Sequence, residues 1–352
     1  MIKIKLQDYH LHRNECLFRP YKQNKLFNEV GIEFVTEGND YDILWIGQAS
    51  YMDKTKSYKE SVDMGIEYVN QFKGQDVIML DGQDSATLKG SYDVFVQTDS
   101  KLLLKNTLYK DLKNYARGSF PTGRIYWNGS YPNHKNNYWL SVYDLETEKF
   151  QNVKLSGTNW LSTVNPTFHD YYQFKKDIDV FAMFQYPAKQ NFEWKVETSN
   201  YYTAHREKCI AEIKKLSPNI KVVTAENGKV PLQEYYNLMA RSKIVIAPFG
   251  YGEIAPRDLE SAMLGCVLIK PDMGHVETVP NIYNPETFIP CQWNFGDLTA
   301  LIGACLNDYE LKREYYVNNM KRTYRTEYTD EKLVLHIYNL LQGLEGYGTH
   351  KI

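Results

Sequence analysis

The stretch with the clearest chemical pattern covers residues 247–271 and reads APFGYGEIAPRDLESAMLGCVLIKP. After its apolar start, Gly250 and Gly252 would allow a ligand to approach the backbone closely. A helix should then begin near Arg257, whose guanidinium can bind a phosphate through two parallel hydrogen bonds. The pattern predicts a site for a phosphorylated, hydroxyl-rich ligand, with its diphosphate on the first backbone NH groups of the helix.

Two carboxylates in this stretch are candidates for binding the sugar part of such a ligand. Glu260 lies three residues after Arg257, so the two side chains share one face of the helix. Glu260 can accept hydrogen bonds from sugar or ribose hydroxyls, and Glu253 can do so from the loop that also holds Tyr251. The alternative is a surface ion pair of Arg257 with Glu260, and a Glu253 that only favours the helix dipole.

A second polar cluster, residues 81–85 (DGQDS), follows a buried-strand pattern. A reaction in which a substrate hydroxyl attacks needs a general base, and Asp81 or Asp84 at a strand end would suit that role. His10, just after the first strand, is a third candidate because an imidazole accepts protons near neutral pH. The alternatives are a polar turn for the aspartates and a structural role for the histidine.

Two basic residues, Lys189 and Arg206, flank the first loop of the second half of the chain. Either could neutralise the phosphates of the same ligand, which would stabilise a phosphorylated leaving group. A solvated surface charge is the alternative for each of them.

Composition limits the classes of protein to which this chain can belong. Its 352 residues carry a net charge of −2, with 43% hydrophobic and 24% charged residues, as in globular proteins with a sizeable core. This balance gives no overall attraction to nucleic acid or to an anionic membrane. The apolar runs are shorter than the roughly 20 residues of a membrane-spanning helix. The five cysteines are scattered without a CxxC pair and no signal peptide is recognisable, so the cytoplasm is the expected location.

The site residues must be positioned by the elements around them, and the chain alternates between strand and helix patterns. In the first half, strands are predicted at 2–6, 32–35, 43–46, 77–80 and 94–96, and helices at 21–30, 57–72 and 101–115. In the second half, strands are predicted at 180–184, 220–224, 244–247, 267–269 and 288–290, and helices at 200–216, 232–241, 257–264 and within 297–344. The two series predict an α/β fold of two Rossmann-like domains, whose ligand lies at the carboxyl ends of the strands.

Residues 250–271 resemble the donor-site segment of exostosin-like and related GT-B glycosyltransferases of viral or microbial type. The similarity falls on Arg257, Glu260, Gly265, Cys266 and Pro271. It implies a GT-B fold with a central cleft between an N-terminal acceptor domain at 1–175 and a C-terminal nucleotide-sugar domain at 176–325. The first domain would carry a hairpin insertion near 138–156, and residues 326–352 would cross back to brace it.

The resemblance also implies a reaction. A hexosyl or pentosyl group would move from a UDP- or GDP-linked sugar to a hydroxyl acceptor, in the first place a glycan, with inversion slightly favoured. No metal and no further cofactor would be required, and the location would be the cytoplasm, that of the host for a viral protein. The spacing of Glu253 and Glu260 departs from that of retaining GT-B enzymes, so the stereochemical outcome stays open.

Two alternatives remain open. A phage-type transferase could glycosylate modified DNA bases, with nucleic acid as the acceptor, and would need a basic rim on the first domain. Its candidates, on one predicted helix, are Lys101, Lys105, Lys110, Lys113 and Arg117. A non-catalytic module could instead bind a glycan or a sugar nucleotide on the same fold without a reaction.

Overall fold

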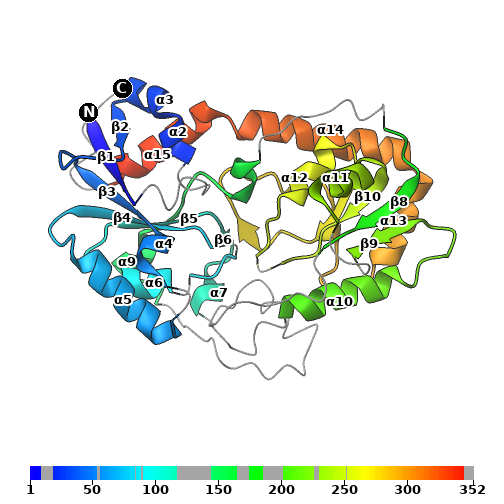
Figure 1. Cartoon of the computed structure of the whole chain (residues 1–352), viewed down its shortest axis with the longest axis horizontal. Helices are drawn as coiled ribbons and strands as arrows, with labels where there is room; N and C mark the ends of the chain where they lie inside the picture. The colour runs from blue at the N-terminus through cyan, green and yellow to red at the C-terminus, as the bar shows by residue number, and fades with distance from the viewer. Residues whose placement is uncertain are drawn as a thin grey trace.

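The computed structural model describes residues 1–8, 19–53, 56–83, 85–88, 90–116, 144–164, 174–184, 201–225, 230–250 and 252–344. Figure 1 shows two α/β units side by side, and the long helix α14 (Tyr309–Glu327) leads from the second unit toward the first. Each unit is built around its own parallel sheet.

The first unit contains a six-stranded sheet of order β2-β1-β3-β4-β5-β7, in which all neighbouring strands are parallel. Its strands are β1 (Ile2–Gln7), β2 (Ile32–Val35), β3 (Ile43–Gly47), β4 (Asp76–Asp81), β5 (Leu102–Lys105) and β7 (Val153–Leu155). Its described helices are α2 (Arg19–Lys22), α3 (Asn24–Glu29), α4 (Gln48–Tyr51), α5 (Tyr58–Asn70), α6 (Ser91–Phe95), α7 (Lys113–Ala116), α9 (Glu148–Gln151) and the 3₁₀ turn η2 (Trp160–Thr163). Every residue of β3 is buried, which explains why its sequence is a continuous apolar run.

The second unit contains a five-stranded parallel sheet of order β13-β11-β10-β8-β9. Its strands are β8 (Ile178–Ala182), β9 (Val222–Thr224), β10 (Ser242–Ile246), β11 (Val267–Pro271) and β13 (Ile289–Cys291). Its helices are α10 (Tyr201–Ile213), α11 (Leu232–Ala240), α12 (Arg257–Met263), α13 (Leu298–Asn307) and α14. The first strand of this sheet lies between the second and the third, so the strand order reverses between β8 and β10. Doubly wound sheets bind their ligands at this switch point.

The last helix, α15 (Asp330–Gln342), returns to the first unit. Its buried side chains share a hydrophobic core with β1 to β5: Leu333, Val334, Ile337 and Leu341. The predicted fold class is therefore confirmed: the chain is an α/β protein with two Rossmann-like units in the GT-B arrangement, braced by a C-terminal helix.

A short antiparallel ladder joins the two units. Strand β6 (Leu108–Tyr109), soon after β5, pairs with β12 (Val276–Glu277), soon after β11. The amide of Lys110 extends the ladder by donating to the carbonyl oxygen of His275 at 3.0 Å. Because both strands follow the ends of parallel strands, the carboxyl edges of the two sheets face each other.

Two elements predicted in the first half are wrong. Residues 94–96 were expected as a strand but lie at the end of helix α6, and residues 101–115 form β5, β6 and the short α7 instead of one helix. Residues 102–104 are fully buried between β4 and β7. Continuous apolar residues in that position form a strand, whatever the spacing of the lysines beside them.

The structure describes only the second half of the hairpin predicted near 138–156, so the hairpin stays a prediction. Strand β7 pairs in parallel with β5 as the edge of the main sheet. It follows helix α9, whose first turn is capped by the side chain of Thr147. Residues 138–143 lie outside the described residues. The domain boundaries at 175 and 325 stay predictions.

Candidate functional site

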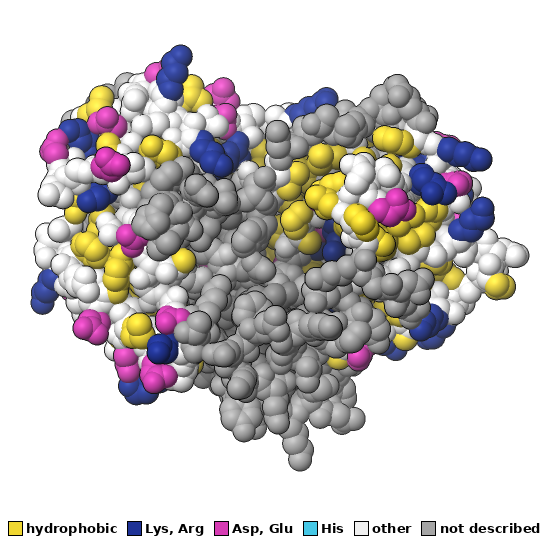
Figure 2. All heavy atoms as spheres, viewed as in Figure 1, with side chains coloured by type: hydrophobic (Ala, Val, Ile, Leu, Met, Phe, Trp, Pro, Cys, Tyr) yellow, Lys and Arg dark blue, Asp and Glu magenta, His cyan; other side chains and the backbone are white. Residues whose placement is uncertain are grey.

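Two arginine side chains lie near the same aromatic ring at the switch point of the second sheet. The guanidinium carbons of Arg206 on α10 and Arg257 on α12 each lie 5.9 Å from the ring centre of Phe184, just after β8. Nε of Arg206 donates to the carbonyl oxygen of Phe249, just after β10, at 3.1 Å. In Figure 2, a dark-blue patch of Lys or Arg is visible in a recess of the second unit, beside hydrophobic side chains. Two cations at this point form a candidate site for an anionic group.

Gly250 provides the space that Arg206 occupies. A Cβ atom on residue 250 would lie 2.7 Å from Nη2 of Arg206, which is closer than such atoms approach. The missing side chain therefore lets the guanidinium lie against the backbone after β10. The sequence predicted that a ligand would use this space, and the structure shows the arginine in it. Gly252 is buried next to it, and Tyr251 lies outside the described residues.

Several NH groups at the start of α12, where the sequence predicted a diphosphate, donate to acceptors of the protein itself. The amide of Ala255 donates to the carboxylate of Asp258 at 3.0 Å. The amide of Asp258 donates to the carbonyl of Ala255, and those of Leu259 and Glu260 donate to the carbonyl of Pro256. Protein acceptors thus occupy these NH groups of the seven-residue helix, and the diphosphate site on its backbone stays a prediction. A diphosphate at the switch point would contact the arginine side chains as well.

Glu260 lies beside Arg257 and two tyrosines of α11. Its Oε1 accepts a hydrogen bond of 2.9 Å from the hydroxyl of Tyr236. Burial raises the pKa of the Glu260 carboxyl, whereas the Tyr236 bond and the Arg257 charge oppose that shift. Burial raises the pKa of Tyr236 to about 12. Burial also raises the pKa of Tyr235, which lies next to Arg257. The Glu260 carboxylate and the tyrosine hydroxyls can bind sugar or ribose hydroxyls. The sequence did not predict the two tyrosines as site residues, because helical spacing alone does not distinguish them from other residues of the helix.

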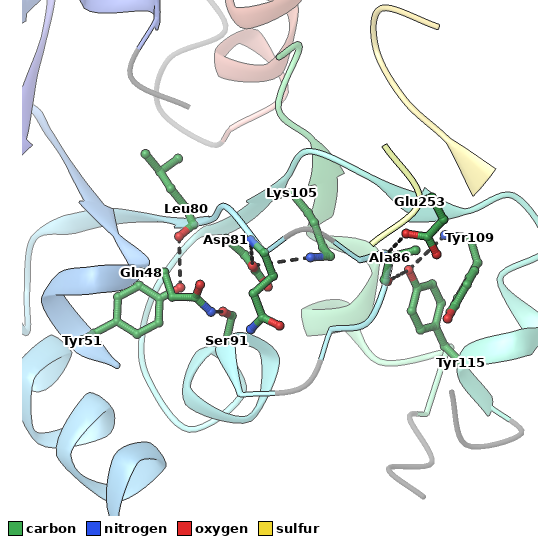
Figure 3. A network of polar contacts seen from close by, with 11 residues as sticks. Gln48, Tyr51, Leu80, Asp81, Ala86, Ser91, Lys105, Tyr109, Tyr115 and Glu253 are labelled. Carbon is green, nitrogen blue, oxygen red and sulfur yellow. Dashed lines mark hydrogen bonds and ion pairs between the residues drawn. The ribbon is translucent and has the colours of Figure 1, made fainter. Parts of the chain in front are cut away.

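Glu253 reaches from the second unit into the first. Its carboxylate is fully buried, and Oε2 accepts a hydrogen bond of 3.2 Å from the amide of Ala86 in the loop after β4. Oε1 lies 3.7 Å from Nε2 of His275 and has no hydrogen-bond partner within the described ranges. Figure 3 shows this carboxylate beside Ala86. Glu253 therefore lies at the contact between the two units.

A buried ion pair fixes the first turn of α12. Nζ of Lys270 on β11 lies 3.1 Å from Oδ2 of Asp258, and neither side chain is exposed. The hydroxyl of Tyr283 donates to the same oxygen at 2.6 Å. Burial lowers the pKa of Lys270, and the Asp258 carboxylate opposes this shift. The pair holds the helix start, and with it Arg257, in place. Sequence reasoning missed both residues, since each lies within an otherwise regular element.

A second polar group lies at the carboxyl ends of β4 and β5. Asp81 and Lys105 are opposite each other in the ladder, with Nζ 3.4 Å from Oδ1, and both side chains are fully buried. Oδ1 also accepts a hydrogen bond of 2.8 Å from the amide of Gln83. Oδ2 has no hydrogen-bond partner among the residues that the structure describes. Figure 3 shows Lys105 directed at Asp81. Oδ1 is fixed by these two contacts, whereas a carboxylate oxygen such as Oδ2 can accept a proton.

Four of the predicted site residues lie outside the described residues, namely His10, Asp84, Lys189 and Tyr251. Their roles stay predictions. Of the described ones, Asp81 lies in the first unit and Glu253 at the contact between the units. The others lie in the second unit: Arg206, Gly250, Gly252, Arg257 and Glu260.

The basic rim predicted for a nucleic-acid acceptor does not exist on one helix. Lys105 is buried at the end of β5, Lys101 precedes that strand, and Lys113 belongs to the short α7. Lys110 lies in the turn between β6 and α7, and Arg117 is outside the described residues. The prediction of a basic helix face was wrong because the apolar residues beside these lysines are buried in strand β5.

Among the described residues, no three His, Cys, Asp or Glu side chains lie close enough together to hold a metal ion. In the same part of the chain, no helix is long and apolar enough to cross a membrane.

No protein-family model matches the chain, and no curated protein matches it significantly. Solved structures similar to it include Anabaena Alr3699/HepE in complex with UDP, at 10% identity over 98% of this chain and 100% of that one, with a TM-score of 0.47. An alpha-glucosyltransferase in complex with UDP is 11% identical over 96% and 98%, with a TM-score of 0.43. Sucrose-phosphate synthase from Thermosynechococcus elongatus is 9% identical over 97% and 98%, with a TM-score of 0.46. Similarities this low assign no ligand and no catalytic residue to this chain.

Proposed function

We propose that the chain is a glycosyltransferase that moves a sugar from a UDP- or GDP-linked donor to a hydroxyl group. The observation that supports this best is the position of both Arg206 and Arg257 beside Phe184 at the switch point of the second sheet. A nucleoside diphosphate is an anion of the size and charge that two guanidiniums bind well. The switch point is also where doubly wound sheets hold nucleotides.

In this proposal the second unit binds the donor. Arg206 and Arg257 contact the diphosphate, and Glu260, held by Tyr236, accepts a hydrogen bond from a ribose or sugar hydroxyl. Negative charge grows on the diphosphate as its bond to the sugar breaks. The guanidiniums stabilise that charge, and such stabilisation is often the largest single contribution to catalysis.

The first unit supplies the base. Oδ2 of Asp81 takes the proton of the acceptor hydroxyl while that oxygen forms a bond to the anomeric carbon of the sugar. The bond from this carbon to the diphosphate breaks in the same step, and the nucleoside diphosphate leaves. A direct displacement of this kind inverts the anomeric carbon. Asp81 lies at the carboxyl edge that faces the second unit, as this role requires.

The test is a panel of UDP- and GDP-linked hexoses and pentoses, with release of the nucleoside diphosphate measured with and without acceptors. We expect turnover of one donor, and a loss of about 100-fold for Glu260→Ala and for Arg257→Ala, the range for removing one group that stabilises a transition state. Unchanged melting temperatures would show that both variants fold. Tight donor binding without any release would indicate a binding module, and full activity of both variants would refute the assigned site.

A further inference from the structure

Several buried polar atoms at the carboxyl ends of β4 and β5 have no hydrogen-bond partner in the part of the chain that the structure describes. They are Oδ2 of Asp81, Oγ of Ser85, Nζ of Lys105, both amide atoms of Asn106 and Oγ1 of Thr107. None of these side chains is exposed. Buried polar groups in folded proteins are nearly always hydrogen-bonded, because each unpaired one destabilises the fold. A group of them in one place therefore indicates a ligand that supplies their partners.

These residues lie at or just after the ends of two neighbouring strands. Asp81 and Lys105 are paired across the ladder, and Asn106 and Thr107 follow Lys105 directly. Ser85 lies on the loop after β4, next to Ala86. The amide of Ala86 binds Glu253 of the second unit, whose Oε1 also lacks a hydrogen-bond partner among the described residues. Figure 3 shows the Asp81–Lys105 pair and the Ala86–Glu253 contact within one view.

The chemistry of these atoms favours hydroxyl groups as their partners. The carboxylate oxygens and the Asn106 carbonyl accept hydrogen bonds, the Lys105 ammonium and the Asn106 amide donate them, and Ser85 and Thr107 do both. A hydroxyl group also donates and accepts, whereas an ionised phosphate only accepts and an ammonium only donates. These atoms include one ammonium, paired with Asp81, and a further carboxylate, that of Glu253, so the region does not attract an anion.

We infer that this cluster is a subsite for an uncharged polyol, a sugar residue that presents several hydroxyls. That this polyol is the acceptor rests on the proposed function. Asp81 would take the proton of one hydroxyl, and Asn106, Thr107 and Ser85 would bind the others. Because the cluster is covered in the arrangement shown, the ligand enters when the contact between Glu253 and Ala86 opens.

The test measures binding of maltose, cellobiose and lactose to the full chain by calorimetry, without a donor. Glucose 6-phosphate and a single-stranded oligonucleotide serve as anionic comparisons. Ser85→Ala and Thr107→Val each remove one unpaired hydroxyl. We expect each to weaken binding of the preferred disaccharide about tenfold, as for the loss of one hydrogen bond, while the melting temperature stays unchanged or rises.

Ser91→Ala is the matched control. Ser91 is as buried as Ser85, but its Oγ accepts a hydrogen bond of 2.9 Å from the side chain of Gln48. Removing this hydroxyl leaves Gln48 unpaired, so the melting temperature should fall while the affinity for the disaccharide stays the same. The control separates loss of a ligand contact from loss of a structural one.

Several results would overturn the inference: no binding of any neutral disaccharide, tighter binding of glucose 6-phosphate or the oligonucleotide, or unchanged affinity in Ser85→Ala and Thr107→Val. Failure of the proposed function would be seen separately. A protein that binds disaccharides through these residues but binds no sugar nucleotide would keep the polyol subsite and lose the glycosyltransferase assignment.

Discussion

Replacement of Gly250 by alanine is the sharpest test of how Arg206 is positioned. The new Cβ would lie 2.7 Å from Nη2 of Arg206, whereas ordinary contacts begin at 3.4 Å. The guanidinium must therefore move by several tenths of an ångström. The atom that moves is the end of a flexible side chain, so we expect the free energy of unfolding to change by about 1 kcal/mol or less, the worth of the bond from Arg206 to Phe249.

The expected effect on ligand binding is larger. A hydrogen bond between a guanidinium and a charged acceptor contributes about 1.5–3 kcal/mol. Its loss weakens binding about 10-fold to 100-fold, since 1.4 kcal/mol corresponds to a factor of ten. The assay is calorimetric titration of the donor selected by the panel, together with urea denaturation to measure stability.

Gly303→Ala is the control for this substitution. Gly303 lies within α13, and a Cβ atom there meets nothing within 4 Å. Alanine should stabilise this helix by about 1 kcal/mol and leave donor affinity unchanged. Wild-type affinity in a stable Gly250→Ala variant would refute the role of Arg206 in donor binding. If the Gly250→Ala variant does not fold, the added methyl group must disturb more than the Arg206 side chain, and the reasoning would be wrong.

Three further predictions concern stability. Lys270→Met leaves the Asp258 carboxylate buried without its cation and should lower the free energy of unfolding by about 3–5 kcal/mol in urea denaturation; a loss below about 1 kcal/mol would contradict the anchoring of α12. Burial lowers the pKa of His205 to about 3, so only the unfolded chain takes up this proton as the pH falls from 6.5, and stability drops toward pH 3. His205→Phe should remove that part of the acid slope, and equal slopes would count against it. Burial raises the pKa of Glu260 above 4.5, so the folded chain holds this proton more tightly than the unfolded chain. The resulting stability is fully present below pH 4.5 and is lost as the pH rises through the raised pKa. Glu260→Gln should therefore be the more stable protein at pH 7 while binding the donor more weakly, and a less stable Gln variant would argue against burial as the cause.

The elements of the second unit could be predicted well from the sequence because their local signals agree. Residues 244–246 of β10 are apolar and buried. Helix α12 starts directly after Pro256 and ends at Met263, two residues before Gly265, whose φ of +70° favours glycine. In the first unit the segment 101–115 misled the prediction. Its lysines are spaced as on a helix, but burial between two strands decided for β5.

The sequence predicted several individual site residues but not which of them lie next to one another. Arg206 and Arg257 were selected one by one, and only the fold shows that both lie at Phe184. Lys105 was missed as the partner of Asp81 because its segment was read as a helix. Glu253 was placed near the donor because it precedes Arg257 in the chain. Its bond to Ala86 joins residues 167 positions apart, a contact that no local pattern reveals.

The central claim is that Arg206 and Arg257 together bind the diphosphate of a nucleotide sugar. Calorimetric titration of UDP and GDP into the wild type, Arg206→Ala, Arg257→Ala and the control Arg322→Ala tests it most directly. Arg322 is an exposed residue of α14 that pairs with Glu286. The claim predicts one nucleotide per chain, a loss of affinity of at least about tenfold in each of the first two variants, and wild-type affinity in the control. Equal affinity in all four proteins, or no binding of either nucleotide to the wild type, would contradict it.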